Sequence, residues 1–204
     1  ESVILNEAHQ VPEIAAQFFG REFSGRQAGL LARDALAELG RIGRADTGAR
    51  ERLGALEAAV ADAAAAIAGG RERIEWGELP EDFLGALERA REALAAAGNE
   101  IHSADPEDPG LRQVVRRAGK LAEVLEAIVD AGPDAGLRWA EPSRGGFTLA
   151  FTPFEVATRF GELMRTRGGA WIFTSATLAV GEDFSHFLGR IGATSARTVR
   201  IESP

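Results

Sequence analysis

Hydrophobic residues recur at helical spacing through the middle of the chain. Three long segments carry apolar positions three or four residues apart, which predicts three amphipathic helices. A segment from Ser24 to Leu39 predicts an earlier helix with Ser24 as its N-cap. The apolar positions of the three segments are Leu53, Leu56, Val60, Ala63 and Ile67; Phe83, Leu87, Ala90 and Leu94; and Leu111, Val114, Ala118, Leu121, Leu125 and Ile128. Gly69–Gly70, Gly98–Asn99 and Gly132–Pro133 are expected to end them. Four such stripes with short breaks predict an antiparallel helical bundle.

The start of the chain has a different pattern. Val3–Leu5 is a short apolar run, which predicts a buried strand. Pro12 suits the first turn of a following helix, whose apolar face we expect to carry Ile14, Phe18 and Phe19. Residues 1–22 therefore form a first piece, distinct from the helical piece of residues 23–136.

The third piece, residues 137–204, alternates between strand and helix patterns. Strands are predicted over 137–139, 146–151, 170–174 and 197–201, and helices over 154–165 and 184–191. This rhythm favours a parallel sheet with helices on its faces. The opening strand cannot stand alone, and we expect it to pair with the strand of residues 170–174. Both strands would then be buried on both faces, as parallel strands usually are. The predicted fold class is α/β, a partial parallel sheet with a large all-helical insertion.

Composition narrows the class of protein. The chain has 204 residues, enough for one domain and part of a second, and a net charge of −8 that argues against a free-standing, strongly nucleic-acid-binding domain. It has no cysteine, which excludes disulfides and thiolate-bound clusters within it. Its single methionine is Met164 and it opens within a predicted strand, which indicates an excised piece. No signal peptide or membrane-spanning run is present, so we expect a cytoplasmic protein without a membrane partner.

The residues after the first strand, Asn6–His9, differ at one position from the Asp-Glu-Ala-His box of helicases. ATP hydrolysis needs a group that holds Mg²⁺ and a carboxylate that orients the attacking water. Glu7 can take the second role. Asn6 stands at the metal position, where a neutral amide holds a hydrated Mg²⁺ more weakly than a carboxylate. The alternative is a polar turn after a buried strand, with His9 capping or hydrogen-bonding nearby, and these four residues leave both interpretations open.

A second polar segment, Thr174–Leu178, follows the apolar run 171–173. Its hydroxyl groups can couple a phosphate site to another domain through hydrogen bonds that change with nucleotide state. The alternative is an ordinary helix N-cap, which Ser and Thr favour. Taken alone, the segment fits the N-cap better.

Together the two segments carry a family resemblance. Residues 3–10 with Pro12 and Glu13 resemble motif II of the DinG/XPD-type superfamily-two DNA helicases, and residues 171–178 resemble motif III. Residues 183–189 and Glu202–Pro204 are similar to the segment after motif III in bacterial members. Asn6 departs from the aspartate of the family. The helical middle matches by position and type only.

The resemblance implies a RecA-like helicase domain 1 (residues 1–22 and 137–204, ending at the start of helicase domain 2) and a helical "arch" (residues 23–136). It implies ATP-driven 5′–3′ movement on single-stranded or forked DNA in repair or replication, with Mg²⁺ as the metal. It places the phosphate-binding loop and iron–sulfur cysteines upstream, so the chain alone should not hydrolyse ATP. The site residues are then Asn6, Glu7, His9, Ser175 and Thr177.

Arg112, Arg116 and Lys120 form a basic stripe at spacing i, i+4, i+8. In a protein that threads a strand past the arch, this stripe is a candidate for phosphate contact. The alternative is a solvated face paired with acids such as Glu123. Trp76 and Trp139 are open to either base stacking or core packing, whereas Phe83 favours the core.

A second hypothesis comes from a different class of protein. The chain would be a non-catalytic helical adaptor that docks a replication or repair protein. Asn6 and the acidic balance both fit it.

Overall fold

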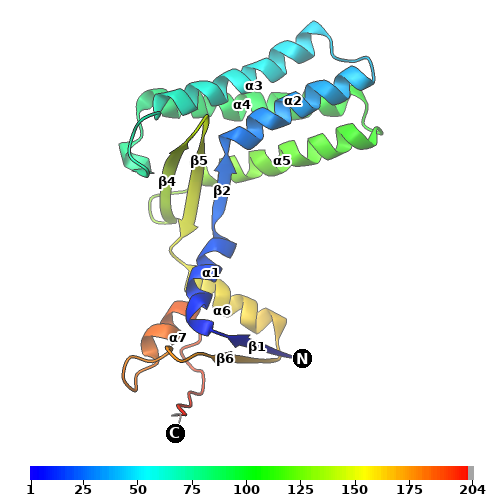
Figure 1. The fold of residues 1–204 in the computed structure, drawn as a ribbon. Coiled ribbons are helices and arrows are strands. Elements are labelled where there is room, and N and C mark those ends of the chain that lie inside the picture. The colour runs from blue at the N-terminus through cyan, green and yellow to red at the C-terminus, as the bar shows by residue number, and fades with distance from the viewer. Residues whose placement is uncertain (202–204) are drawn as a thin grey trace. The chain divides into compact units, whose positions relative to one another are not determined.

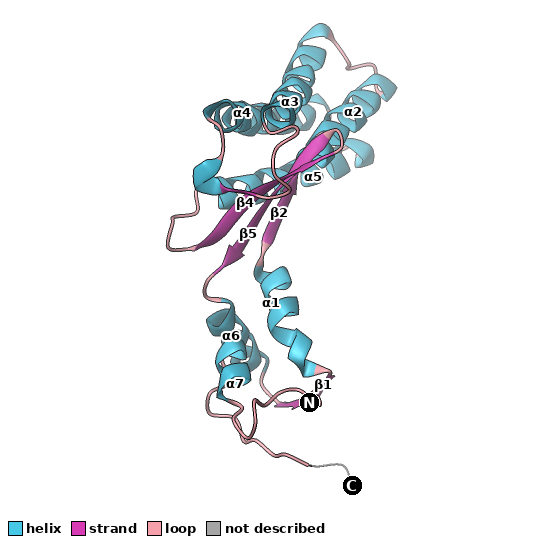
Figure 2. Ribbon diagram, turned by 60° about the vertical axis from the view of Figure 1, so that its left-hand side comes forward, coloured by secondary structure: helices cyan, strands magenta, loops and turns pink. Residues whose placement is uncertain are grey.

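The computed structural model describes residues 1–201 and divides the chain into two compact units. Unit 1 contains residues 1–20, 132–137 and the described residues from Thr152 onward, and unit 2 contains residues 21–131 and 138–151. Glu202–Pro204, which contribute to the family resemblance, lie outside the described residues. Figures 1 and 2 show the helices and strands of each unit.

Unit 1 is a small α/β unit around a two-stranded parallel sheet. Strand β1 (Ser2–Asn6) pairs with β6 (Ala170–Thr174), as predicted, with Asn6 opposite Thr174. The helices are α1 (Val11–Phe19), α6 (Val156–Arg167) and α7 (Ser185–Ile191), and a 3₁₀ helix, η1, covers Ala8–Gln10. Their buried side chains form one apolar cluster with the inner face of the sheet.

Unit 2 is a helical bundle with a small antiparallel sheet. Helices α2 (Gly25–Arg41) and α3 (Thr47–Ala66) are followed by β3 (Ile74–Glu75) and the 3₁₀ helix η2 (Trp76–Glu78). Helices α4 (Glu81–Ala104) and α5 (Pro109–Val129) complete the bundle. Each helix packs mainly against two others, α2 on α3 and α5, and α4 on α3 and α5. Figure 1 shows the four helices side by side, which confirms the predicted bundle.

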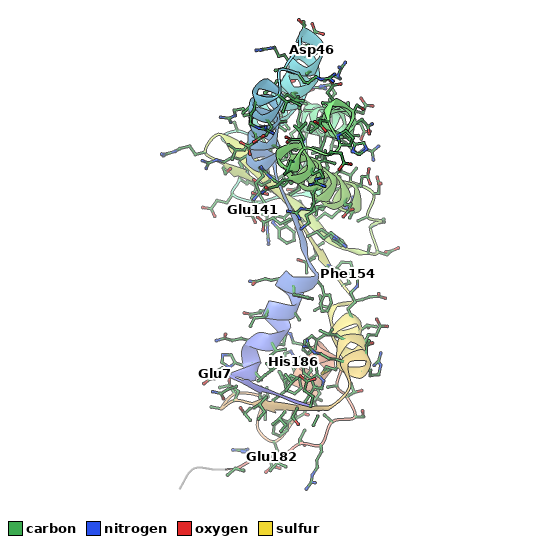
Figure 3. All side chains as sticks on the ribbon, turned by 90° about the vertical axis from the view of Figure 1, so that its right-hand side faces the viewer. Glu7, Asp46, Glu141, Phe154, Glu182 and His186 are labelled. Carbon is green, nitrogen blue, oxygen red and sulfur yellow. The ribbon has the colours of Figure 1, made fainter. Side chains whose placement is uncertain are left out.

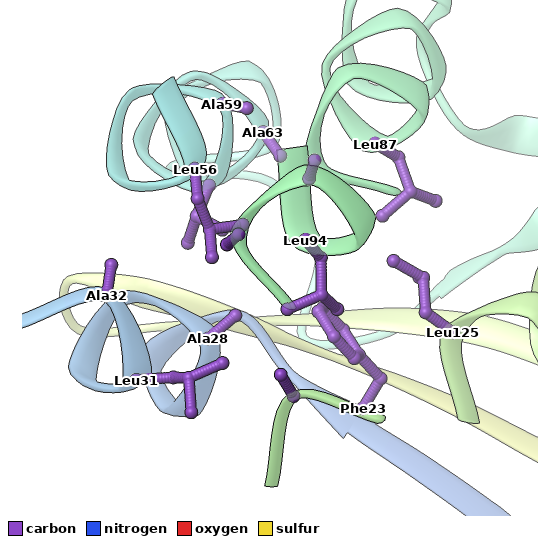
Figure 4. Packing of buried hydrophobic residues seen from close by; sticks show 14 of the residues in the cluster. Phe23, Ala28, Leu31, Ala32, Leu56, Ala59, Ala63, Leu87, Leu94 and Leu125 are labelled. Atoms are coloured by element: carbon purple, nitrogen blue, oxygen red, sulfur yellow. The ribbon is translucent and has the colours of Figure 1, made fainter. Parts of the chain in front are cut away.

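The apolar core of unit 2 explains why the spacing of hydrophobic residues predicted the helical bundle well. Leu56, Leu87, Leu94 and Leu125 come from three helices and converge with Phe23, as Figure 4 shows. All five side chains are almost completely buried. Burial of a Leu or Phe side chain contributes roughly 1.5–3 kcal/mol, so this shared core stabilises the bundle more than helix propensity does.

The strands of unit 2 differ from the prediction. The order in its sheet is β2-β5-β4-β3, where β2 is Arg21–Ser24, β4 is Gly136–Ser143 and β5 is Gly146–Pro153. Strands β2 and β5 are antiparallel, as are β3 and β4. The expectation that the strands after residue 137 join the parallel sheet is therefore wrong for the β4–β5 hairpin, which packs with the helical unit.

Three further expectations need correction. Residues 197–201 form no strand, and Val199 and Ile201 are exposed because this segment joins neither sheet of the described residues. Helix α4 continues past Gly98 to Ala104, since a glycine lowers helix propensity without ending a helix that packing supports. In α1, Ile14 and Phe18 are exposed, because the buried stripe is the adjacent one, formed by Val11, Pro12 and Ala15.

Candidate functional site

The parallel register of β1 and β6 brings two polar strand ends to one sheet edge. Asn6 and Thr174 are direct partners across the sheet. The Thr174 hydroxyl donates a hydrogen bond to Asn6 Oδ1 over 3.0 Å. The amide oxygen at the predicted metal position therefore already accepts one hydrogen bond from its neighbour. Thr174 was not among the predicted site residues, although the predicted pairing of the two strands held the signal for it.

Glu7 follows β1 in the left-handed backbone conformation, with φ of 53° and ψ of 40°. Among the described residues it is the only non-glycine residue with positive φ. Such a conformation is uncommon for a residue with a side chain, and it is found where surrounding structure imposes it, often at functional sites. Its carbonyl accepts from the Gln10 amide, which closes the short η1 turn. Figure 3 shows Glu7 at the end of β1.

The Ser175 hydroxyl connects the two motif segments. It donates to Glu7 Oε2 over 3.4 Å, and it lies 3.0 Å from Nδ1 of His9. The same His9 nitrogen is 3.4 Å from Glu7 Oε2. These contacts are mutually consistent when His9 carries its proton on Nδ1. That N–H then donates to the Ser175 hydroxyl oxygen, and the Ser175 O–H donates to the Glu7 carboxylate. Ser175 Oγ also accepts from the Thr177 amide at 3.4 Å and lies 3.5 Å from the Thr177 hydroxyl.

The structure thus brings together all five predicted residues of this site. Several contacts are long, near the outer limit for hydrogen bonds, so each one is weak. The side chains of Glu7 and His9 are 60% and 42% exposed. A loosely connected, solvent-accessible edge leaves a carboxylate, an imidazole and hydroxyls available to a polar ligand and to water.

One of the alternative interpretations does not fit the geometry. The segment after Thr174 caps no helix, since residues 175–184 contain turns and a β-bridge and the next helix, α7, begins at Ser185. The other alternative, a polar turn with His9 capping or hydrogen-bonding nearby, stays open, because the His9 ring makes no capping bond within its own turn but hydrogen-bonds Ser175. The polar groups of the two segments bond mainly to each other.

Mg²⁺ is a hard cation that is bound through oxygen atoms, and few such ligands lie at this edge. Within residues 1–201, no group of three or more His, Cys, Asp or Glu side chains is arranged to hold a metal ion. The edge supplies the single carboxylate of Glu7 and the amide oxygen of Asn6. Mg²⁺ keeps several waters and is usually bound through one or two carboxylates together with substrate phosphates. These residues therefore fit a hydrated ion held mainly by the phosphates of a bound nucleotide.

The predicted basic stripe lies on α5 in unit 2. Arg112, Arg116 and Lys120 are solvent-accessible, and none of them forms an ion pair with any described residue. Glu123, the acid that was the expected partner, makes no such pair within residues 1–201 either. The alternative interpretation requires that neighbouring acids pair with these cations, and the described residues do not show such pairs.

The two open tryptophans each stack against an arginine. The Arg138 guanidinium lies 4.3 Å from the centre of the Trp76 ring, and Arg73 lies 3.7 Å from that of Trp139. Arg138 also donates to the carbonyl oxygens of Ile128 and Val129 at the end of α5. Cation–π contacts of this kind already occupy one face of each ring, which disfavours base stacking there. Phe83 is fully buried, as expected.

Comparison with known proteins identifies the family. No family model matches the chain. The chain is 31% identical to the ATP-dependent DNA helicase YoaA of Escherichia coli (strain K12), over 99% of this chain and 32% of the relative. It is 30% identical to the ATP-dependent DNA helicase YoaA of Haemophilus influenzae, over 100% of this chain and 32% of the relative.

The chain belongs to the DinG-like helicases, as its motifs indicated. It spans about a third of the length of the curated relatives that it matches. In the part of the chain that the structure describes, every helix is too short or too polar to cross a bilayer.

Proposed function

We propose that the whole protein is a cytoplasmic ATP-dependent DNA helicase that moves 5′ to 3′ on single-stranded or forked DNA in repair or replication. The observation that carries the proposal is the parallel pairing of β1 with β6, which joins the two motif ends into one hydrogen-bonded edge. Ligands of open α/β sheets bind at the carboxyl ends of the strands, and this edge is such an end. The names of the two relatives support the activity.

In this proposal unit 1 contributes to helicase domain 1, and the bundle is the arch. The boundaries inferred from sequence, 1–22, 23–136 and 137–204, differ from the structural units mainly at the β4–β5 hairpin. Because β2, β3, β4 and β5 share one sheet, we assign the hairpin to the arch.

The chemistry assigned to the edge depends on its groups. Bound Mg²⁺ would neutralise charge on the phosphates, with Asn6 serving its hydration shell. The Glu7 carboxylate orients the attacking water towards the phosphate and accepts a proton from that water. Ser175 is hydrogen-bonded to both Glu7 and His9. When a nucleotide binds, these long hydrogen bonds break and the Ser175 hydroxyl takes new partners. Thr177 and His9 then relay the nucleotide state to the rest of the protein.

The accessible stripe of Arg112, Arg116 and Lys120 supplies the DNA contact of the arch. Cations that lack a protein partner can pair with phosphates without first breaking an ion pair. Binding through such contacts releases counterions, so it weakens steeply as salt is added.

A Glu7→Gln variant of the full-length protein tests the catalytic assignment. We expect DNA-stimulated ATP turnover to fall by at least about a hundredfold while nucleotide binding is retained, because the amide cannot accept the proton of water. Glu162→Gln is the matched control, since Glu162 lies exposed on α6, outside both motif segments, and forms no hydrogen bond or ion pair with the site residues within residues 1–201. Turnover by Glu7→Gln at the rate of the Glu162→Gln control would contradict the assignment.

The 204-residue chain alone provides a second test. Mixed with ATP, Mg²⁺ and single-stranded DNA, it should show no turnover, because it contains no glycine-rich lysine loop to hold the phosphates.

The adaptor hypothesis retains one observation in its favour. Asn6 carries no charge, and its oxygen is bonded to Thr174. If the full-length protein neither binds nor hydrolyses ATP yet docks a replication or repair protein, the edge is structural and the adaptor function replaces the motor.

A further inference from the structure

A groove lies at the end of the bundle where α4 leads into α5. Its volume is about 270 Å³, and the atoms that it exposes are chiefly apolar. This volume is slightly below the range of about 300–1,000 Å³ that is common for pockets of drug-sized ligands, so it suits one small planar group. The lining residues are His102, Asp105, Pro106, Arg112, Val115 and Arg116.

Two cations of the basic stripe line this groove. Arg112 and Arg116 are one helical turn apart on α5, and neither has an ion-pair partner among residues 1–201. Six other arginines on the four helices form ion pairs, whereas Arg26 and Arg50 form none within residues 1–201. The paired ones are Arg33, Arg41, Arg52, Arg89, Arg91 and Arg117. In a chain of net charge −8, acids to pair with are abundant. The groove therefore keeps positive charge that an anionic ligand can neutralise.

Two of the nearby acids, Asp105 and Asp108, are already engaged. Asp105 Oδ1 accepts from the backbone amides of Glu107 and Asp108, which fixes the turn that forms one wall. Asp108 accepts from Arg41 and from the Leu111 amide, and the Arg41 hydrogen bond is the main cause that lowers its pKa. These bonds hold the carboxylates to the turn and to α2, so they compete less with a ligand for the two arginines.

We propose that this groove is a nucleotide subsite for single-stranded nucleic acid. The phosphates lie on Arg112 and Arg116, and one base enters the groove against Val115, Pro106 and the His102 ring. Lys120 extends the phosphate track, since eight residues of helix span about 12 Å. The proposal rests on the DNA binding proposed above and deepens it, because it adds a place for a base where the stripe alone contacts only the backbone. Apolar and aromatic walls tolerate any base, so binding should show little sequence preference.

Fluorescence anisotropy with the complete 204-residue chain and no ATP tests the subsite. The probe is a labelled oligothymidylate, and the competitor is a strand of equal length with abasic sugars. Oligothymidylate should bind at least about fivefold more tightly than the abasic strand, because a stacked base contributes on this scale. Equal affinity for the two strands would overturn the proposal.

The double variant Arg112→Ala with Arg116→Ala should weaken oligothymidylate binding at least about tenfold. The slope of the logarithm of affinity against the logarithm of salt concentration should become shallower by the amount that corresponds to about two phosphate contacts. The matched control is Arg33→Ala with Arg89→Ala, which removes the same charge from α2 and α4. If both double variants bind alike, the proposal fails. Thermal unfolding midpoints near that of the parent chain show that each variant is folded. Since ATP is absent, a failure here is distinct from a failure of the Glu7 experiment.

Discussion

At the residue scale, the hydrogen bond between Thr174 and Asn6 involves a position where the family resemblance implies an aspartate. An aspartate would accept the same hydroxyl hydrogen bond and would add a negative charge at the sheet edge. The asparagine preserves the bond and lacks the charge. The geometry of the edge is thus retained, while the electrostatic attraction for a metal ion is reduced.

Asn6→Asp in the full-length protein should therefore strengthen Mg²⁺ use. We expect the Mg²⁺ concentration for half-maximal ATP turnover to fall on the order of tenfold, because a charged oxygen holds the hydrated ion more tightly. Thr174→Val, which removes the hydroxyl and adds no charge, should not lower it. An unchanged Mg²⁺ requirement in Asn6→Asp would show that position 6 does not serve the metal.

Asp108 makes the bundle sensitive to acid. Its pKa is held below the ordinary value by the Arg41 hydrogen bond first and by the Leu111 amide second. The carboxylate thus contributes stability above its unfolded pKa of about 3.9, and this contribution is lost as the pH falls through the lower folded value. Asp108→Asn should lower the urea midpoint at neutral pH, and the difference should shrink at about pH 2.5. The control Asp62→Asn, with a 61% exposed carboxylate, should change the midpoint little at either pH.

At the scale of elements, helices were more predictable than strands. The spacing of Leu53, Leu87 or Leu125 depends only on neighbours three or four residues away, and all three are buried as predicted. The short strands β2 and β3 were missed because four and two residues carry too little pattern. On α1 the choice of Ile14 and Phe18 was wrong, because a nine-residue helix offers two adjacent apolar stripes and packing selects one.

Gly25 shows how one element limits another. A Cβ atom there would lie 2.5 Å from the ring of Phe147, which is 1% exposed and packed edge-on against Phe83. Gly25→Ala should therefore destabilise the chain by about 1–3 kcal/mol, since the ring has no room to move. Gly29→Ala on the same helix meets no atom within 4 Å and should stabilise it by roughly 0.5–1 kcal/mol. Urea denaturation measures both, and a neutral Gly25→Ala would mean that the start of α2 shifts freely.

At the scale of the whole molecule, the two units differ in how much they bury. Unit 2 has the larger apolar cluster. The smaller cluster of unit 1 supports a sheet of two strands, on whose outer face Ile4 and Ile172 are 67% and 46% exposed. Parallel strands are normally covered on both faces, so this sheet is the less protected element.

Hydrogen exchange should reveal this difference. Amides of residues 2–6 and 170–174 should exchange faster than those of residues 83–97 in α4, because local opening requires less free energy where fewer apolar contacts are lost. Mass spectrometry of peptides from the complete chain gives the comparison directly. Slower exchange in the β1–β6 sheet than in α4 would contradict this ranking of the two units.

The sequence by itself determined the helices, most of their buried stripes and the polar segments that end β1 and β6, because these depend on local spacing and on residue chemistry. It also indicated the pairing of β1 with β6, since two apolar runs need a common sheet. Only the tertiary structure decided that the β4–β5 hairpin joins the bundle and that residues 197–201 join neither described sheet. An alternating strand can join any sheet edge that covers its apolar side, and the choice depends on distant partners that local pattern does not contain.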